Sequence, residues 1–122
     1  MSVTLGVISS PNHPANYPNN LDRTEIITVD TGKILRLEFT VFAIYGNPNI
    51  NRCYDFVRIT DGDGTTLMYK GCGFSDQPSW ISYFQPPIIR TNTNRVEIYF
   101  HTNGDSAASG WSLRWTALQE GD

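Results

Sequence analysis

The stretch CYDFVRITDGDG, residues 53–64, decides the fold. Its centre, residues 56–60, is rich in aromatic and β-branched side chains and alternates in polarity, the pattern of a strand that buries one face. The two Asp-Gly pairs at 61–64 follow it directly, and Asp-Gly beside an alternating segment is typical of a tight hairpin turn. The stretch therefore predicts an antiparallel pairing that begins near Cys53 and reverses at residues 61–64.

The same alternation recurs along the chain. It is found in four further segments: residues 25–29, 34–39, 95–100 and 111–115. Turn-forming clusters of Gly, Asn, Asp and Pro lie between them, and no stretch keeps a 3.6-residue period over three turns. Short strands separated by turns predict an all-β, antiparallel sandwich or barrel.

Size and charge restrict the class of protein. A chain of 122 residues fits a single domain, residues 1–122. The net charge is −3 and no Lys/Arg cluster is present, so a nucleic-acid partner is not expected. The longest apolar stretch, residues 34–45, is interrupted by Arg36, Glu38 and Thr40, and membrane insertion is not expected either.

Three prolines mark the segment SSPNHPANYP, residues 9–18. Each proline fixes its own φ and favours an extended residue before it. We therefore expect a polyproline-like arm at the rim of the sandwich.

From about residue 6 to residue 118, an ordered set of motifs resembles the CUB domain family. The motifs are G-V-I-S-S-P-N-H-P with Y-P (residues 6–18), L-x-L-x-F-x-x-F (35–42), C-Y-D-F-V (53–57), C-G (72–73), P-P-I-I (86–89), N-x-V-x-I-x-F (94–100) and G-W-x-L-x-W (110–115). The resemblance implies a two-sheet, jelly-roll-like sandwich in a secreted or cell-surface protein, serving as a binding module. No Gly-x-Ser-x-Gly, His-Glu-x-x-His or phosphate-loop motif is present, so enzyme activity is not expected.

The resemblance also implies a disulfide between Cys53 and Cys72. Such domains usually have a second disulfide, but Arg23 stands at one of its positions and Glu25 replaces a Trp often found nearby. We therefore expect a single crosslink.

Calcium is the cofactor that the resemblance raises. Many such domains bind Ca²⁺ at one end through three acidic positions, which correspond here to Tyr45, Asp55 and Asn103. Only Asp55 keeps its carboxylate, although Asp105 and Ser106 could add oxygens. A rearranged calcium site using Asp55, Asn103 and Asp105 is one interpretation; the other is that Asp55 accepts hydrogen bonds from loop amides.

The same end is a candidate partner-binding surface. An acid-leaning rim made of Tyr45, Asp55, Asn103, Asp105 and Ser106 could receive a Lys or Arg side chain from an extracellular protein. The alternatives are a structural spacer within a larger secreted protein and a carbohydrate-binding module that stacks sugars on Tyr45 or on tyrosine and tryptophan side chains of the next segment.

That segment, residues 74–85, resembles an insertion relative to the family pattern. Its aromatic residues Trp80, Tyr83 and Phe84 are candidates for contact with a partner. The alternative is that the insertion folds back as a lid over a sheet edge or the core.

Overall fold

The computed structural model describes residues 4–76 and 82–119. Within these ranges the elements are β1 (Leu5–Ser9), β2 (Asp22–Thr28), β3 (Lys33–Ile44), the short 3-10 helix η1 (Pro48–Ile50), β4 (Phe56–Asp61), β5 (Thr66–Gly71), β6 (Gly73–Phe74), β7 (Ile89–Arg90), β8 (Arg95–His101) and β9 (Gly110–Gln119). No helix in the described part of the chain is long and apolar enough to span a membrane.

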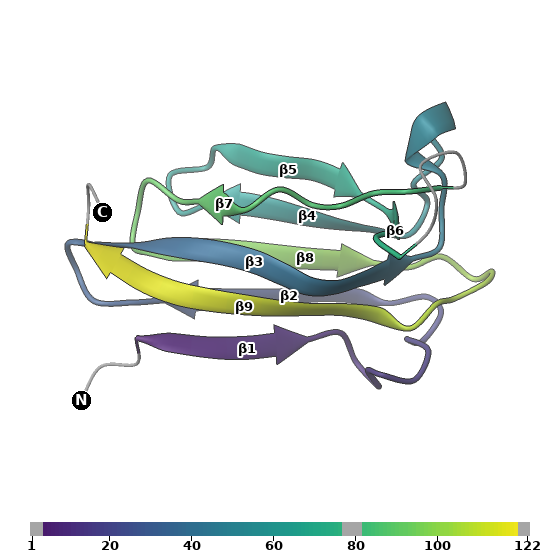
Figure 1. The fold of residues 1–122 in the computed structure, drawn as a ribbon, viewed down its shortest axis with the longest axis horizontal. Helices are drawn as coiled ribbons and strands as arrows, with labels where there is room; N and C mark the ends of the chain where they lie inside the picture. The colour runs from purple at the N-terminus through teal and green to yellow at the C-terminus, as the bar shows by residue number, and fades with distance from the viewer. Residues whose placement is uncertain (1–3, 77–81, 120–122) are drawn as a thin grey trace.

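Two antiparallel sheets face each other (Figure 1). One has the order β1-β9-β3-β6, with β7 also paired to β3, and the other has the order β2-β8-β4-β5. β4 and β5 pair across residues 61–66, which confirms the hairpin predicted from the Asp-Gly pairs. The all-β, jelly-roll-like sandwich is thus confirmed.

The core lies between the sheets and follows the period of two. Val96, Ile98 and Phe100 of β8 are fully or almost fully buried, whereas the residues between them are half-buried on the outer face. A register shift in β3 between Phe39 and Val41 interrupts its pairing with β9. Because such a bulge adds a residue to one strand, it bends β3 and keeps apolar side chains on the core side along its length.

The segment 9–18 differs from the polyproline-like arm that the prolines predicted. The N–H of His13 donates to the carbonyl oxygen of Ser10, and that of Ala15 donates to the carbonyl oxygen of Asn12. Asn12 has a left-handed backbone with φ of 67°, which Asn tolerates better than most residues. Pro11 and Pro14 therefore lie within successive tight turns, Pro18 follows these turns, and the segment places Tyr17 in the core.

The disulfide predicted between Cys53 and Cys72 is present. It ties the chain just before β4 to the junction of β5 and β6, at the end of the sandwich where η1 lies (Figure 1). We call this end, where β3 and β8 finish and β4 and β9 begin, the loop end.

Candidate binding site at the loop end

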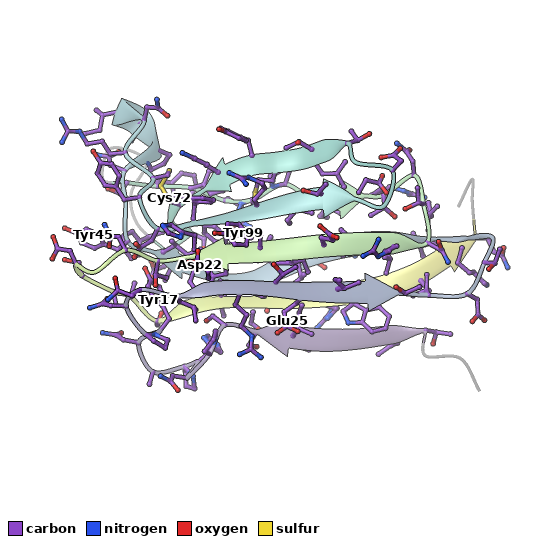
Figure 2. All side chains as sticks on the ribbon, turned by 180° about the vertical axis from the view of Figure 1, so that it is seen from behind. Tyr17, Asp22, Glu25, Tyr45, Cys72 and Tyr99 are labelled. Atoms are coloured by element: carbon purple, nitrogen blue, oxygen red, sulfur yellow. A yellow bond between two sulfur atoms is a disulfide. The ribbon has the colours of Figure 1, made fainter. Side chains whose placement is uncertain are left out.

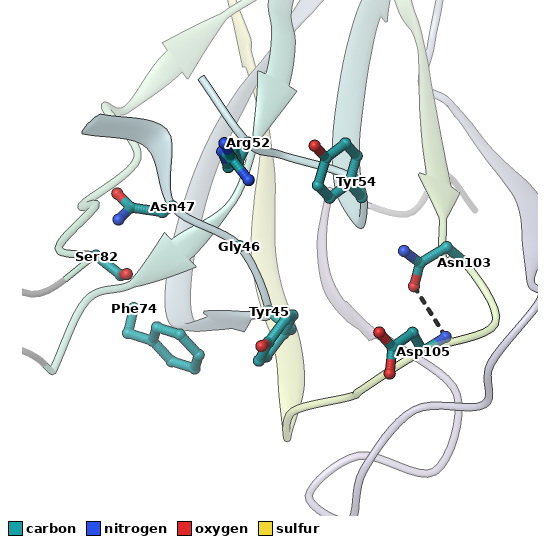
Figure 3. Close-up of a pocket in the computed structure, with 9 residues that line it drawn as sticks. All are labelled: Tyr45, Gly46, Asn47, Arg52, Tyr54, Phe74, Ser82, Asn103 and Asp105. Atoms are coloured by element: carbon teal, nitrogen blue, oxygen red, sulfur yellow. Dashed lines mark hydrogen bonds between the residues drawn. The ribbon is translucent and has the colours of Figure 1, made fainter. Parts of the chain in front are cut away.

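A pocket of about 450 Å³ opens at the loop end (Figure 3). It is formed where loops from both sheets meet. Its lining residues are Tyr45, Gly46, Asn47, Arg52, Tyr54, Phe74, Ser82, Asn103 and Asp105. The structure thus brings together three residues of the predicted partner-binding rim, Tyr45, Asn103 and Asp105.

Asp55, the fourth member of that rim, lies beneath the pocket with only 1% of its surface exposed. Its Oδ2 accepts a hydrogen bond from the Tyr17 hydroxyl at 2.8 Å, and its Oδ1 accepts one from the Asn103 N–H at 2.8 Å. The Tyr17 oxygen in turn accepts from the Tyr45 N–H at 2.9 Å. One buried carboxylate therefore joins the 9–18 turns, the end of β3 and the loop after β8; Tyr17 and Tyr45 are labelled at this end in Figure 2.

Burial sets the protonation of this pair. Desolvation raises the pKa of Asp55 above its ordinary value, and the hydrogen bonds from Asn103 and Tyr17 offset this only in part. Burial likewise raises the pKa of Tyr17, so the phenol keeps its proton. Tyr17 is consequently the donor in this hydrogen bond and Asp55 the acceptor. Both Asp55 oxygens are thus engaged within the protein.

The exposed part of the pocket carries two tyrosine rings and two charged side chains, those of Asp105 and Arg52. Tyr45 is 52% exposed and Tyr54 is 61% exposed. Asp105 lies on the rim, where its N–H donates to Oδ1 of Asn103 at 3.2 Å (Figure 3) and its own Oδ1 accepts from the Ser106 hydroxyl at 3.4 Å. Among the described residues, Asp105 forms no ion pair with a Lys or Arg, so its carboxylate is available to a ligand.

The loop at 46–52 is held in shape by its own sequence. Asn47 caps η1, its side-chain oxygen accepting from the Asn49 N–H at 3.0 Å, and Asn47 and Arg52 exchange backbone hydrogen bonds. Gly46 packs so closely on the disulfide that an added Cβ would lie 2.7 Å from Sγ of Cys72. The disulfide therefore packs directly against the 46–52 loop and supports it.

The aromatic insertion is divided between core and surface. The Phe84 ring packs against the buried Phe42 ring, with centroids 5.4 Å apart, in agreement with the fold-back alternative. Tyr83 remains 38% exposed. Trp80 lies outside the described residues.

The loop end does not present the oxygen set that calcium needs. Ca²⁺ takes six to eight oxygen ligands and relies on carboxylates for charge. Here each Asp55 oxygen already accepts a hydrogen bond, Tyr45 offers a phenol, and among the described residues Asp105 is the one carboxylate that lines the pocket. Within the described part of the chain, no three His, Cys, Asp or Glu side chains are grouped to hold a metal ion. The described residues of this loop end therefore offer too few carboxylates to make up a calcium site on their own.

A disulfide-bonded, jelly-roll-like sandwich with a pocket among its end loops defines a class of β-sandwich modules, and comparison with known proteins identifies the family. The CUB domain family model matches residues 2–115, and the chain belongs to this family. CUB domains are non-catalytic modules. Cubilin from Rattus norvegicus is 29% identical over 118 residues, which cover 97% of this chain and 3% of cubilin, so the chain spans only a small part of that relative.

Solved CUB structures share the fold. The CUB1-EGF-CUB2 domain of human MASP-1/3 has a TM-score of 0.80 and 22% identity, covering 96% of this chain and 42% of that one. The MASP-1 CUB2 domain bound to Ca²⁺ has a TM-score of 0.78 and 24% identity, covering 94% of each chain. One structural neighbour is thus a calcium-bound CUB domain.

Tyr17, Arg52 and Tyr54 are among the residues of the loop end that the sequence did not predict. Tyr17 was seen only as part of a Tyr-Pro motif, yet it carries the central hydrogen bonds. Tyr54 and Arg52 line the pocket because the disulfide and the 46–52 loop place them there. The Cys-Tyr-Asp order was a usable signal for Tyr54, since it stands between a crosslinked residue and a buried carboxylate.

Proposed function

We propose that this CUB domain recognises a protein partner by receiving a Lys or Arg side chain in the loop-end pocket. The observation that carries the proposal is the Asp105 carboxylate, which has no cationic partner among the described residues and lines the same pocket as the exposed rings of Tyr45 and Tyr54. A carboxylate supplies the charge complement to a cation, and tyrosine faces attract cations by cation–π interaction.

The buried hydrogen bonds around Asp55 hold the pocket in shape before a partner binds. Asp55 joins three separate segments beneath the pocket, and the disulfide supports a fourth. A site that is ordered before binding loses less conformational entropy on association. In this proposal Asp55 and Tyr17 position the loops, whereas Tyr45, Tyr54, Asn103 and Asp105 make the contacts, with Ser106 orienting the Asp105 carboxylate.

We further propose that binding is independent of calcium and takes place outside the cell. The first proposal is supported by the hydrogen bond that each Asp55 oxygen accepts within the protein and by Tyr45 at a position where related domains have a carboxylate. The second is supported by the disulfide, because such bonds persist in oxidising compartments.

Carbohydrate recognition is the second candidate. Exposed Tyr45 and Tyr83 could stack on sugar rings, and Asn103 and Asp105 could hydrogen-bond their hydroxyls. Charge distinguishes the two candidates: a neutral sugar needs Asp105 only as a hydrogen-bond acceptor, whereas a Lys or Arg side chain requires its negative charge.

A lysine side chain is the simplest probe of the pocket. In an NMR titration of the ¹⁵N-labelled chain, N-acetyl-lysine amide is expected to shift the amide signals of Tyr45, Tyr54 and Asp105 in a saturable manner. Asp105→Asn should weaken this binding about fivefold, the effect of removing one exposed charge pair. N-acetyl-norleucine amide, which has a similar stem without the ammonium, should not bind measurably.

Asp30→Asn is the matched control. Asp30 is an exposed aspartate in the turn between β2 and β3, at the opposite end of the sandwich from the pocket. It changes the net charge by the same amount and should leave lysine binding unaltered. Equal weakening by Asp30→Asn and Asp105→Asn, or equal binding of the norleucine compound, would contradict the proposal.

A further inference from the structure

The outer face of the four-stranded sheet carries a second cluster of polar and aromatic side chains. We call it the cationic face. It comprises Phe56, Arg58, Tyr69, Lys70, Tyr99 and His101, from β4, β5 and β8. None of these residues lines the loop-end pocket. Figure 2 looks onto this face and labels Tyr99.

A β-bulge brings the cluster together. Val57 pairs with Gly71 and Ile59 pairs with Met68, so Arg58 alone stands opposite two residues, Tyr69 and Lys70. An extra residue in one strand interrupts the alternation of side chains between the two faces. Two consecutive side chains of β5 therefore lie beside Arg58 on the outer face, and both are exposed.

Aromatic rings hold the Arg58 guanidinium in place. Its carbon lies 5.2 Å from the Phe56 ring centroid, 5.1 Å from that of Tyr69 and 5.7 Å from that of Tyr99. Its Nε donates to the Tyr69 carbonyl oxygen at 3.3 Å, and no other acceptor among the described residues takes its remaining N–H groups. The Lys70 ammonium lies 5.1 Å from the Phe56 centroid and 5.5 Å from that of Tyr69. The two cations are thus positioned side by side over shared rings.

Neither cation is neutralised within the described part of the chain. Arg23, Arg36 and Arg95 each pair with a glutamate two residues further along, but Arg58 and Lys70 form no ion pair. The Asp22 carboxylate lies on the same face, where its Oδ1 accepts from the Tyr99 hydroxyl and lies 2.6 Å from Nδ1 of His101, but it forms no ion pair with Arg58 or Lys70. A chain of net charge −3 therefore keeps two unpaired positive charges together on one sheet face.

We propose that the cationic face binds an acidic segment of a protein partner, one that offers two neighbouring carboxylates. Arg58 presents free N–H groups in a planar fork, the geometry that suits a carboxylate, and Lys70 supplies a second charge beside it. Tyr69, 64% exposed, provides an aromatic contact for an apolar side chain next to the acidic pair.

Charge favours a peptide over a polyanion. Sulfated glycans and nucleic acids carry a dense, extended charge that requires many cations in a row, whereas this face offers two, Arg58 and Lys70. The two cations, Arg58 and Lys70, match the two carboxylates of the proposed acidic segment in number and in charge. This surface is independent of the loop-end pocket and of opposite sign, so the domain would contact acidic and basic segments at different places.

Acetyl-Glu-Glu-amide tests the face, with acetyl-Gln-Gln-amide as the uncharged comparison. In an NMR titration of the whole chain, the glutamate peptide is expected to shift the Arg58 Nε–H signal and the backbone amides of Tyr69, Lys70 and Tyr99 in a saturable manner. Arg58→Gln and Lys70→Gln should each weaken binding about fivefold. Arg58→Lys should recover part of the loss, since it restores the charge without the planar fork.

Arg114→Gln is the matched control, because Arg114 is an exposed arginine of β9 on the other sheet. It should leave peptide binding unchanged. Thermal unfolding of each variant checks that the fold is retained, and Lys70→Gln serves as the readout if Arg58→Gln is destabilised. Absence of saturable shifts, equal binding of the glutamine peptide, equal weakening by Arg114→Gln, or tighter binding of a heparin tetrasaccharide to these residues would each overturn the proposal.

Discussion

Replacing both cysteines, Cys53→Ala with Cys72→Ala, is expected to lower the free energy of unfolding by about 3 kcal/mol, because the crosslink no longer restricts the unfolded chain across a separation of 19 residues. Loss of the crosslink should also loosen the 46–52 loop, which lines the pocket. Gly46 packs directly on Cys72, Pro48 lies close to Gly73, and the hydrogen bonds described for the 46–52 loop lie within the loop itself. Faster hydrogen exchange at the amides of Asn49 and Arg52 is therefore expected.

Urea denaturation of the wild type and the double variant measures this effect. The control is reduction: a thiol reductant should bring the wild type to the stability of the double variant and leave the variant itself unchanged. A difference in unfolding free energy below about 1 kcal/mol, well under the usual range for a native crosslink of this size, would show that the disulfide contributes little.

Asp55→Ala is expected to be comparably damaging, with a loss of about 3 kcal/mol in unfolding free energy. The Tyr17 hydroxyl and the Asn103 N–H would both lose their acceptor in a buried environment, and each unsatisfied donor costs about 1–3 kcal/mol. The affinity for N-acetyl-lysine amide should fall too, although Asp55 does not reach the pocket surface, since the loops that carry Tyr45 and Asp105 lose their common anchor. Denaturation and the NMR titration give the two readouts.

The difference in unfolding free energy between the wild type and Asp55→Ala should depend on pH. Burial raises the pKa of folded Asp55 above its unfolded value, so the contribution of its titration to stability is present at low pH and is lost as the pH rises through the folded pKa. The stability gap between wild type and Asp55→Ala should therefore widen as the pH falls from 7 toward 4. Asp30→Ala, which removes an exposed aspartate, should show neither the loss nor this widening; a gap that narrows on acidification would contradict the account.

Much of the fold was predictable because alternation in polarity reports burial directly. Four of the five predicted segments lie wholly within strands, and the fifth, residues 25–29, runs one residue past the end of β2 at Thr28. β5 was predicted only as the partner strand of the 61–64 hairpin, because its bulge, at Tyr69 and Lys70, disrupts the alternation that identifies a strand. β6 and β7 have two residues each, and their pairing with β3 is a tertiary effect with no local signal.

The site was predictable in its location and not in its construction. The family motifs placed Tyr45, Asn103 and Asp105 at one end, and the structure brings them to one pocket. The interpretation of Asp55 as an acceptor for loop amides agrees with its hydrogen bond from the Asn103 N–H. The role of Tyr17 depends on burial, which the sequence of separate loops does not reveal. The 9–18 segment was predicted wrongly because proline restricts φ without determining how the residues between prolines turn.

We propose that hydrogen bonds within the chain, and not a bound cation, hold the loop end in place. The predictions for the loop-end pocket depend on this. The melting temperature in millimolar Ca²⁺ and in chelator tests this most directly, because an ion that binds only the folded state must raise it. We predict the same melting temperature in both solutions. A rise of several degrees in Ca²⁺, abolished by Asp55→Ala, would show instead that a metal site organises these loops.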